Sequence, residues 1–207
     1  MAKKEWLDVF SPEMVHIGIK SRDEIHRDGL WHHTFQCWLL FKEEGKDYIL
    51  FQRRHPDKKD YPNLLDITAA GHLDAGEGPA DGVRELKEEL GIDVSIDKLI
   101  SIGMVPNVIM TDQIKDREFS HVYVYPYQGQ ISELQLQDDE VASIIRIEVN
   151  AFRSFVQGQL HVITGYEYET DQMTIKQILL KHDDFVPHPE EYILFLMKEI
   201  DQIIDTR

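Results

Sequence analysis

Short runs of apolar and aromatic residues, each of the length of a β-strand, recur between residues 35 and 149. The first two, Phe35–Phe41 and Tyr48–Arg54, flank a polar segment at Glu43–Lys46, which predicts two paired strands joined by a turn. Asp66–Leu73 predicts a third strand that leads into a glycine-rich turn. Further strands are predicted at Leu99–Val105, His121–Tyr127 and Ala142–Val149.

One segment between these strands has the features of a helix. Pro79 suits the first turn, no proline interrupts Ala80–Leu90, and Gly91 stands where a helix-ending glycine is expected. We therefore expect a helix of about three turns. The order of three strands, a helix and further strands predicts an α/β protein, in which a mixed sheet is sandwiched between helices.

From Asn150 onward the pattern turns helical. It is clearest in a series of apolar residues whose spacing of three and four makes one face: Ile193, Leu196, Met197, Ile200, Ile203 and Ile204. Pro189 is the expected start of this helix. We expect one domain over residues 1–150 and a helical C-terminal extension, residues 151–207, packed on the same domain. A dimerisation element is the alternative role of the apolar face, so both a monomer and a homodimer stay open.

Composition limits the classes of function. A chain of 207 residues with 42% hydrophobic content can form one domain with a substantial core. No apolar run approaches the roughly 18 residues that span a bilayer, and the first residues lack the apolar core of a signal peptide, so we expect a cytoplasmic protein without a membrane partner. The formal net charge of −16 argues against a nucleic-acid partner. The single Cys37 forms no intramolecular disulfide.

Three carboxylates occupy the predicted helix. Glu85, Glu88 and Glu89 are spaced so that all three project over one face, whereas the apolar residues of the helix project over another. Like charges this close repel unless a cation lies among them, and Mg²⁺ or Mn²⁺ suits carboxylate oxygens. The alternative is a solvated acidic helix face. The glycines before the helix favour a metal site, because Gly71, Gly76 and Gly78 let the backbone approach a ligand closely.

The segments around this helix follow a specific order. Gly71-His-Leu-Asp-Ala-Gly-Glu77 leads, after a short turn, into Arg84-Glu-Leu-Lys-Glu-Glu-Leu-Gly-Ile92. This order resembles the Nudix box, the signature of hydrolases that cleave a nucleoside diphosphate linked to another group. The family pattern has seven residues between its first glutamate and its arginine, whereas six separate Glu77 from Arg84. The departure leaves the helix register unchanged and concerns the turn from Gly76 to Ala80 and the contact between Glu77 and Arg84.

The resemblance implies a Nudix-type α/β/α sandwich, a small-molecule diphosphate substrate and Mg²⁺ or Mn²⁺ as cofactor. It implies metal ligands in the box, of which the last two glutamates are also catalytic: the Gly71 carbonyl, Glu85, Glu88 and Glu89. It assigns structural roles in the box to Glu77, Arg84 and Gly91. Outside the box, Glu118 and Glu140 are the candidates for the general base or a further ligand. Arg53 and Arg54, at a strand end, are the candidates for gripping phosphate through bidentate hydrogen bonds.

Further segments resemble the branch of Nudix proteins related to isopentenyl diphosphate isomerase. They are Glu24-Ile-His26-Arg-Asp-Gly-Leu-Trp31-His32, Gln52-Arg53-Arg54, Asp57-Lys-Lys-Asp-Tyr-Pro62 and Asp66-Ile-Thr-Ala-Ala-Gly71-His72. The isomerase holds a metal ion with residues that match His26, His32, His72, Asp116 and Glu118. The resemblance therefore implies a candidate second metal site. The alternative is that the histidines are hydrogen-bonded residues of the site wall.

One position separates this chain from the isomerase. The isomerase carries a cysteine directly before the Gly-His pair, whereas Ala70 occupies that position here and has no titratable group. The complete set of box carboxylates also favours hydrolysis, with a nucleotide or nucleotide sugar as the expected substrate. Two alternatives stay open. One is an isomerase-like enzyme or isoprenoid diphosphate phosphatase, and the other is a non-catalytic Nudix-fold module that binds a nucleotide.

Overall fold

The computed structural model describes residues 5–111, 115–168 and 174–207. Within these residues eleven strands join into one sheet: β1 Trp6–Phe10, β2 His16–Ser21, β3 Trp31–Glu43, β4 Lys46–Arg54, β5 Leu65–Asp66, β6 Ala69–His72, β7 Ile100–Met110, β8 Lys115–Tyr127, β9 Val141–Glu148, β10 Ile163–Tyr168 and β11 Ile175–Leu180. The α-helices are α1 Arg22–Asp28, α2 Arg84–Leu90, α3 Val149–Val156 and α4 Glu190–Asp205.

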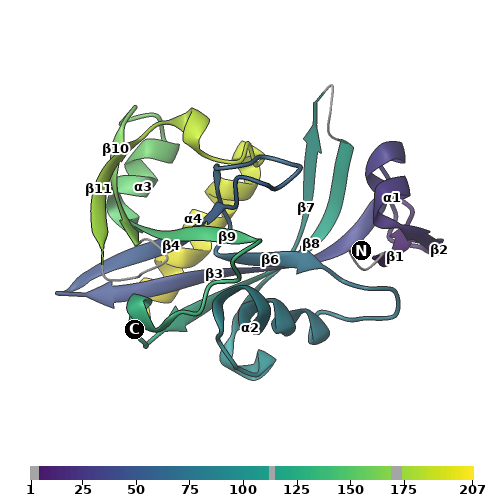
Figure 1. Cartoon of the computed structure of the whole chain (residues 1–207), viewed down its shortest axis with the longest axis horizontal. Coiled ribbons are helices and arrows are strands. Elements are labelled where there is room, and N and C mark those ends of the chain that lie inside the picture. The colour runs from purple at the N-terminus through teal and green to yellow at the C-terminus, as the bar shows by residue number, and fades with distance from the viewer. Residues whose placement is uncertain (1–4, 112–114, 169–173) are drawn as a thin grey trace.

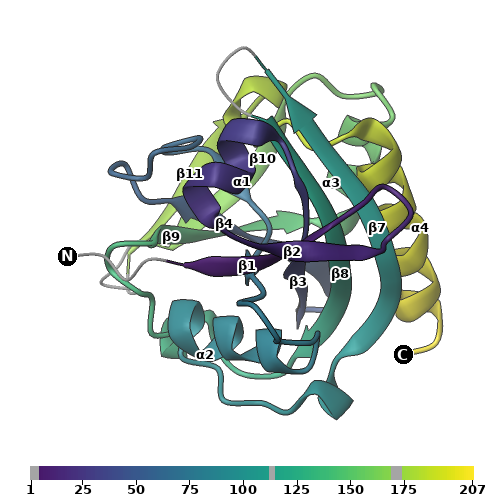
Figure 2. The same ribbon diagram turned by 90° about the vertical axis from the view of Figure 1, so that its right-hand side faces the viewer.

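The sheet is mixed, and β3 lies at its centre. The main path runs β11-β10-β9-β4-β3-β1-β2, and β3 also pairs with β6 and β8. The β3–β8 pairing is parallel, whereas the other pairings between named strands are antiparallel. Helix α2 lies on one side of the sheet, and α3 and α4 lie on the other (Figures 1 and 2). The predicted α/β class with a mixed sheet between helices is confirmed.

Alternate residues of β3 enter two different cores. Phe35, Cys37 and Leu39 pack with residues of α2, such as Leu86, in one apolar cluster. Trp38 and Leu40 pack on the opposite face, in the cluster that contains Phe152 of α3 and Leu196 of α4. Both faces of this part of β3 are therefore buried, which explains why its sequence is a continuous apolar run rather than an alternating one.

The predicted hairpin is present, and β3 is longer than expected. Leu40 faces Ile49 across the pair, and the turn contains Glu44 and Gly45, both with positive φ angles, 49° and 78°. The third predicted strand, Asp66–Leu73, is wrong as one continuous element. It is divided into the short strands β5 and β6, because β5 pairs with β4 whereas β6 pairs with β3.

The predicted helix over Ala80–Leu90 begins with a different geometry. Asp81–Val83 is a 3₁₀ turn, and the α-helix itself starts at Arg84. The 3₁₀ turn packs closely against β3, since a Cβ atom at Gly82 would lie 2.5 Å from Cβ of Phe35. The helix ends as predicted, since Gly91 adopts a left-handed conformation with φ of 72°.

The expectation of helices alone after Asn150 is wrong. Strands β10 and β11 lie in this region, and β10 pairs with β9, so residues on both sides of position 150 share one sheet. The helical signal was correct for α4, which starts directly after Pro189 and buries its apolar face against the sheet. No described helix has the length and apolar content to cross a membrane.

Candidate functional site

Helix α2 brings a buried carboxylate directly under the backbone of β6. The side chain of Glu85 packs so closely on Gly71 that a Cβ atom there would lie 2.2 Å from Cδ of Glu85. A side chain at position 71 would displace the Glu85 carboxylate from this position. Arg84 holds the backbone of His72, the residue after Gly71, because its Nη2 donates to the carbonyl oxygen of His72 at 3.0 Å. The glycine-rich turn and the start of the helix therefore form one closely packed unit.

The contact between Glu77 and Arg84 is present although the loop is one residue shorter than the family pattern. Arg84 Nε and Nη2 donate to the two oxygens of Glu77 at 3.3 and 3.1 Å. Glu77 also accepts from the backbone N–H of Asp74 at 2.8 Å, which closes the turn. The bidentate pair braces the loop against the helix.

The three helix carboxylates have different environments. Glu85 and Glu89 are buried, with 8% and 6% of their surface exposed. Glu89 Oε2 accepts from the backbone N–H of Ala70 at 3.1 Å and from Gln52 Nε2 at 3.3 Å. The side chain of Glu88 is 54% exposed and forms an ion pair with Arg84 at 3.5 Å. The expected common face is therefore only approximate, because Glu88 lies at the solvent edge of the helix.

Burial makes the two inner carboxylates weak acids. Burial, with a further contribution from the nearby charge of Glu85, raises the pKa of Glu89 to about 8. Burial also raises the pKa of Glu85 to about 7, against the opposing charge of Arg84. Two carboxylates of this kind are stabilised in their ionised form by a cation, which is the chemistry of a divalent-metal site.

Metal-free protein is expected to lose stability as the pH rises from about 6.5 to about 8. In this window the folded protein keeps a proton on Glu89 that the unfolded chain releases, since the ordinary pKa is 4.5. Part of this loss is offset by histidines whose pKa values burial lowers, because in the unfolded chain they still release protons between about pH 6.5 and 7.5: His26, His32, His33 and His121. The free energy of unfolding should fall by roughly 2 kcal/mol through Glu89 alone.

Denaturant titrations of chelator-treated protein at the two ends of this window measure the effect. Glu89→Gln should flatten the pH dependence, and Mg²⁺ or Mn²⁺ should raise the stability by binding the folded state only. The same pH dependence of the unfolding midpoint in the wild-type protein and in Glu89→Gln would contradict a buried, protonated Glu89.

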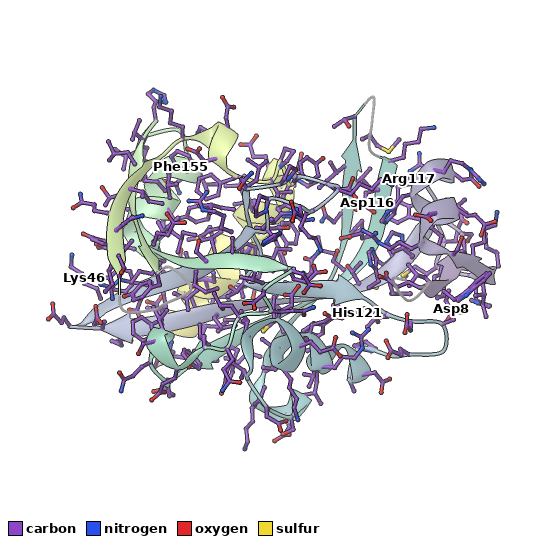
Figure 3. The ribbon with its side chains drawn as sticks, in the orientation of Figure 1. Asp8, Lys46, Asp116, Arg117, His121 and Phe155 are labelled. Carbon is purple, nitrogen blue, oxygen red and sulfur yellow. The ribbon has the colours of Figure 1, made fainter. Side chains whose placement is uncertain are left out.

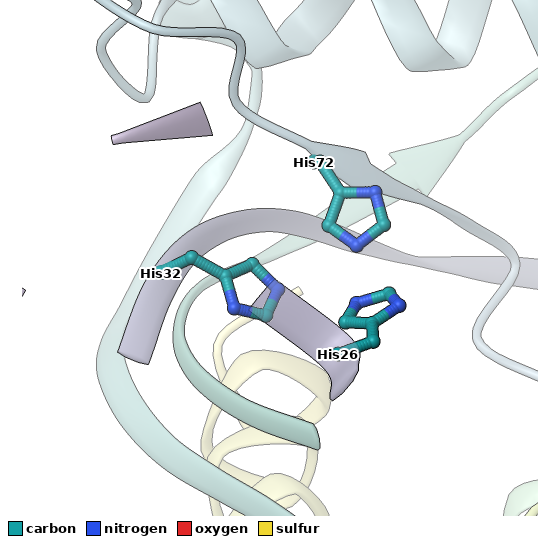
Figure 4. Close-up of side chains that lie close together, drawn as sticks. All are labelled: His26, His32 and His72. Carbon is teal, nitrogen blue, oxygen red and sulfur yellow. The ribbon is translucent and has the colours of Figure 1, made fainter. Parts of the chain in front are cut away.

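Three histidines from three different elements meet near the end of β6. His26 lies on α1, His32 on β3 and His72 on β6, and their rings point toward one another (Figure 4). One ligand atom of each lies within 4.8 Å of the others. His32 forms a second such group with Asp116 and Glu118 of β8. The strand register explains the second group, because His32 stands directly opposite Glu118 in the parallel β3–β8 pair.

The inner atoms of this histidine cluster have no hydrogen-bond partner. His26 Nε2, His32 Nε2 and Asp116 Oδ1 are buried and unpaired, and the two nitrogens lie 3.8 and 3.7 Å from the oxygen. Buried polar atoms are rarely left in this state without an ion or water. The outer nitrogens are engaged instead: Nδ1 of His32 contacts the carbonyl of Leu30 at 3.1 Å, and Nδ1 of His72 contacts Glu5 at 3.4 Å.

These contacts are those of metal-ligating histidines, whose second nitrogen donates to a carbonyl or carboxylate. Burial lowers the pKa of His26 to about 3 and that of His32 well below its ordinary value, which keeps both rings neutral, as a ligand must be. The donor set of imidazole and carboxylate groups fits a transition metal ion such as Zn²⁺ or Mn²⁺.

Glu118 is held in place by an array of donors. Its Oε2 accepts from Thr34 Oγ1 at 3.3 Å, Gln36 Nε2 at 3.1 Å, Asn107 Nδ2 at 3.2 Å and Ser120 Oγ at 3.1 Å. Burial raises its pKa well above the ordinary range, with a further contribution from the charge of Asp116. Glu118 is therefore a fixed group that can accept a proton or a cation.

The other predicted residues lie in ion pairs. Arg53 Nε donates to Glu167 at 2.6 Å, and Arg54 Nη1 donates to Asp66 at 2.9 Å. Glu140 is paired with Lys58, a cation whose charge also acts on Glu89. Lys58 was not singled out from the sequence, although it lies in the Asp57–Pro62 segment. In Figure 3, Asp116 lies on the other side of the molecule's centre from Lys46 and Phe155.

Comparisons with known proteins point to one family. Residues 31–164 match the family model described as NUDIX domain. An uncharacterized Nudix hydrolase of Clostridium acetobutylicum is 39% identical over 202 residues, which cover 96% of this chain and 98% of that protein. Nudix hydrolase 3 of Arabidopsis thaliana is 31% identical over 170 residues, 79% of this chain and 22% of that protein. The crystal structure of DR0079 from Deinococcus radiodurans shares the fold, with a TM-score of 0.55 at 19% identity over 74% of this chain and 90% of that one.

Proposed function

Because the chain belongs to the Nudix hydrolase family, we propose that it is a divalent-metal-dependent enzyme that cleaves the diphosphate bond of a nucleoside diphosphate linked to another group. Members of this family act on pyrophosphate bonds, so hydrolysis follows from the family. The nucleotide substrate and the metal dependence are what we propose. The observation that carries it is the pair of buried carboxylates, Glu85 and Glu89, beneath the Gly71 turn. A site of this kind needs positive charge, and so does a diphosphate.

The residues of the chain have separate roles in this proposal. Glu85, Glu88 and Glu89, with the Gly71 carbonyl, would hold Mg²⁺ or Mn²⁺, an ion that would neutralise phosphate charge and lower the pKa of a water molecule. Of the two carboxylates outside the box, Glu118 is favoured as the general base or further metal ligand, because its donors fix it in position whereas Glu140 is engaged by Lys58. Arg53 and Arg54 would reach phosphate only by exchanging their present carboxylate partners.

A second metal ion is part of the proposal. His26, His32 and His72, with Asp116 and Glu118, would hold a transition metal ion, and the unpaired inner atoms of the histidine cluster support this over a wall of hydrogen-bonded histidines. This ion would lie beside the helix site, since His72 directly follows Gly71 in the chain.

The site lacks the thiol that the alternative isomerase activity would need. Ala70 occupies the position of the isomerase cysteine, and the one cysteine of the chain, Cys37, is fully buried in the core beneath α2. Burial raises the pKa of the Cys37 thiol, so it is a poor proton donor or acceptor in this reaction. Hydrolysis needs no thiol, and the box carboxylates supply its chemistry.

A screen of purified protein tests the proposal. The protein is incubated with Mg²⁺ or Mn²⁺ and a panel of nucleoside diphosphate derivatives, nucleotide sugars and isoprenoid diphosphates, and phosphate-containing products are measured. We expect metal-dependent cleavage of a nucleotide substrate and no reaction after chelation. Double-bond migration in an isoprenoid diphosphate without phosphate release would instead establish the isomerase, and binding without turnover across the panel would establish a non-catalytic module.

A further inference from the structure

Residues after position 164, outside the segment that matches the family domain, reach the buried side of the candidate site. His188 lies just before α4, and Tyr192 lies in its first turn with its ring 5.5 Å from that of His188. Tyr192 is buried, with 1% of its surface exposed, and the side chain of His188 is only 9% exposed. Neither residue contacts Glu118 directly, but each contacts one of its hydrogen-bond donors.

The first connection runs through Asn107. Asn107 Nδ2 donates to Glu118 at 3.2 Å and lies 3.3 Å from Nδ1 of His188. Since an amide N–H donates, Nδ1 of His188 accepts and its Nε2 carries the proton. That Nε2 lies 2.8 Å from Asp66 Oδ1, and the other oxygen of Asp66 accepts from Arg54 at 2.9 Å. His188 thus connects Asn107, which donates to Glu118, with the ion pair of Asp66 and Arg54.

The second connection runs through Gln36. Tyr192 Oη donates to Gln36 Oε1 at 2.7 Å and accepts from Trp38 Nε1 at 2.9 Å. With its carbonyl oxygen engaged by Tyr192, the Gln36 amide presents Nε2 to Glu118 at 3.1 Å. An amide fixed at one end in this way cannot rotate without leaving a buried polar atom unpaired.

We propose that His188 and Tyr192 are positioning residues of the active site, which orient Glu118 through Asn107 and Gln36. The C-terminal segment is then a functional part of the site rather than only a packing layer. The activity arm of the following test rests on the proposed hydrolysis, whereas the metal-binding arm rests only on the proposed ligation of a metal ion by Glu118. Loss of a group that orients a metal ligand typically lowers metal affinity or activity by about 10- to 100-fold.

The test compares substitutions that remove one connection each. Tyr192→Phe deletes only the hydroxyl and keeps the ring that packs in the core. His188→Ala removes the link between Asn107 and Asp66, and His188→Gln restores one donor and one acceptor. The Mn²⁺ affinity of chelator-treated protein is measured by calorimetry without substrate, and kcat and KM are measured separately. His182→Ala is the matched control, because His182 lies exposed on the same segment and stacks on Phe155.

Tyr192→Phe and His188→Ala are each expected to weaken Mn²⁺ binding and lower kcat by about 10-fold or more, with KM changed by less than about two-fold. His188→Gln should recover part of both losses, and His182→Ala should lose neither. Wild-type Mn²⁺ affinity and kcat in both Tyr192→Phe and His188→Ala would overturn the inference while leaving the hydrolase proposal intact. If the wild-type protein hydrolyses nothing, the hydrolase proposal fails and the Mn²⁺ affinities still decide whether these residues orient Glu118.

Discussion

Glu89→Gln should lower kcat by about 100- to 1000-fold while the protein stays folded. Glutamine keeps an oxygen that can accept from the backbone N–H of Ala70, but it cannot carry the negative charge that binds a divalent cation. It also removes a buried carboxylate whose pKa burial raises to about 8. The variant should therefore be at least as stable as the wild-type protein without metal, and its loss of activity cannot be attributed to unfolding.

Steady-state kinetics at saturating Mg²⁺ and thermal unfolding of the same preparations measure both effects. Lys87→Gln is the control, because Lys87 lies on the same helix, is exposed and pairs with Asp93 away from the site. It should retain wild-type kcat. Turnover of Glu89→Gln near the wild-type level would show that the metal assignment on α2 is incorrect.

The second large effect concerns metal content. Protein purified without a histidine tag and dialysed is expected to retain roughly one equivalent of Zn²⁺ or Mn²⁺, because imidazole ligands favour these ions over Mg²⁺. His72→Ala should lose this metal, since it removes one of the three histidines that converge at the site. The metal content of the dialysed proteins is measured by elemental analysis.

His161→Ala provides the control for this experiment, as His161 is exposed and belongs to neither metal group. It should retain the metal of the wild-type protein. A wild-type preparation that contains no transition metal and becomes active only with added Mg²⁺ would mean that the histidines are wall residues and that α2 alone binds the catalytic metal.

Local sequence patterns predicted a large part of the fold. The hairpin of β3 and β4 was evident because two apolar runs flank a turn, and the end of α2 was evident because Gly91 suits a left-handed conformation. Strands β10 and β11 were missed. They are short and lie at and next to one edge of the sheet. Strand β11 is mostly exposed, and polar residues and a glycine interrupt β10, so their sequences lack the apolar runs that identified the central strands.

The sequence by itself determined which chemical groups the protein carries: the carboxylates of α2, the histidines and the glycine at position 71. Only the tertiary structure decided which of these groups meet. His32 and Glu118 are neighbours because β3 and β8 pair in one register, and His188 reaches Asn107 because α4 packs across the sheet. Side-chain spacing along a chain reports contacts within one helix or strand, whereas strand register and helix packing depend on the whole core, so contacts between distant segments follow from the folded structure alone.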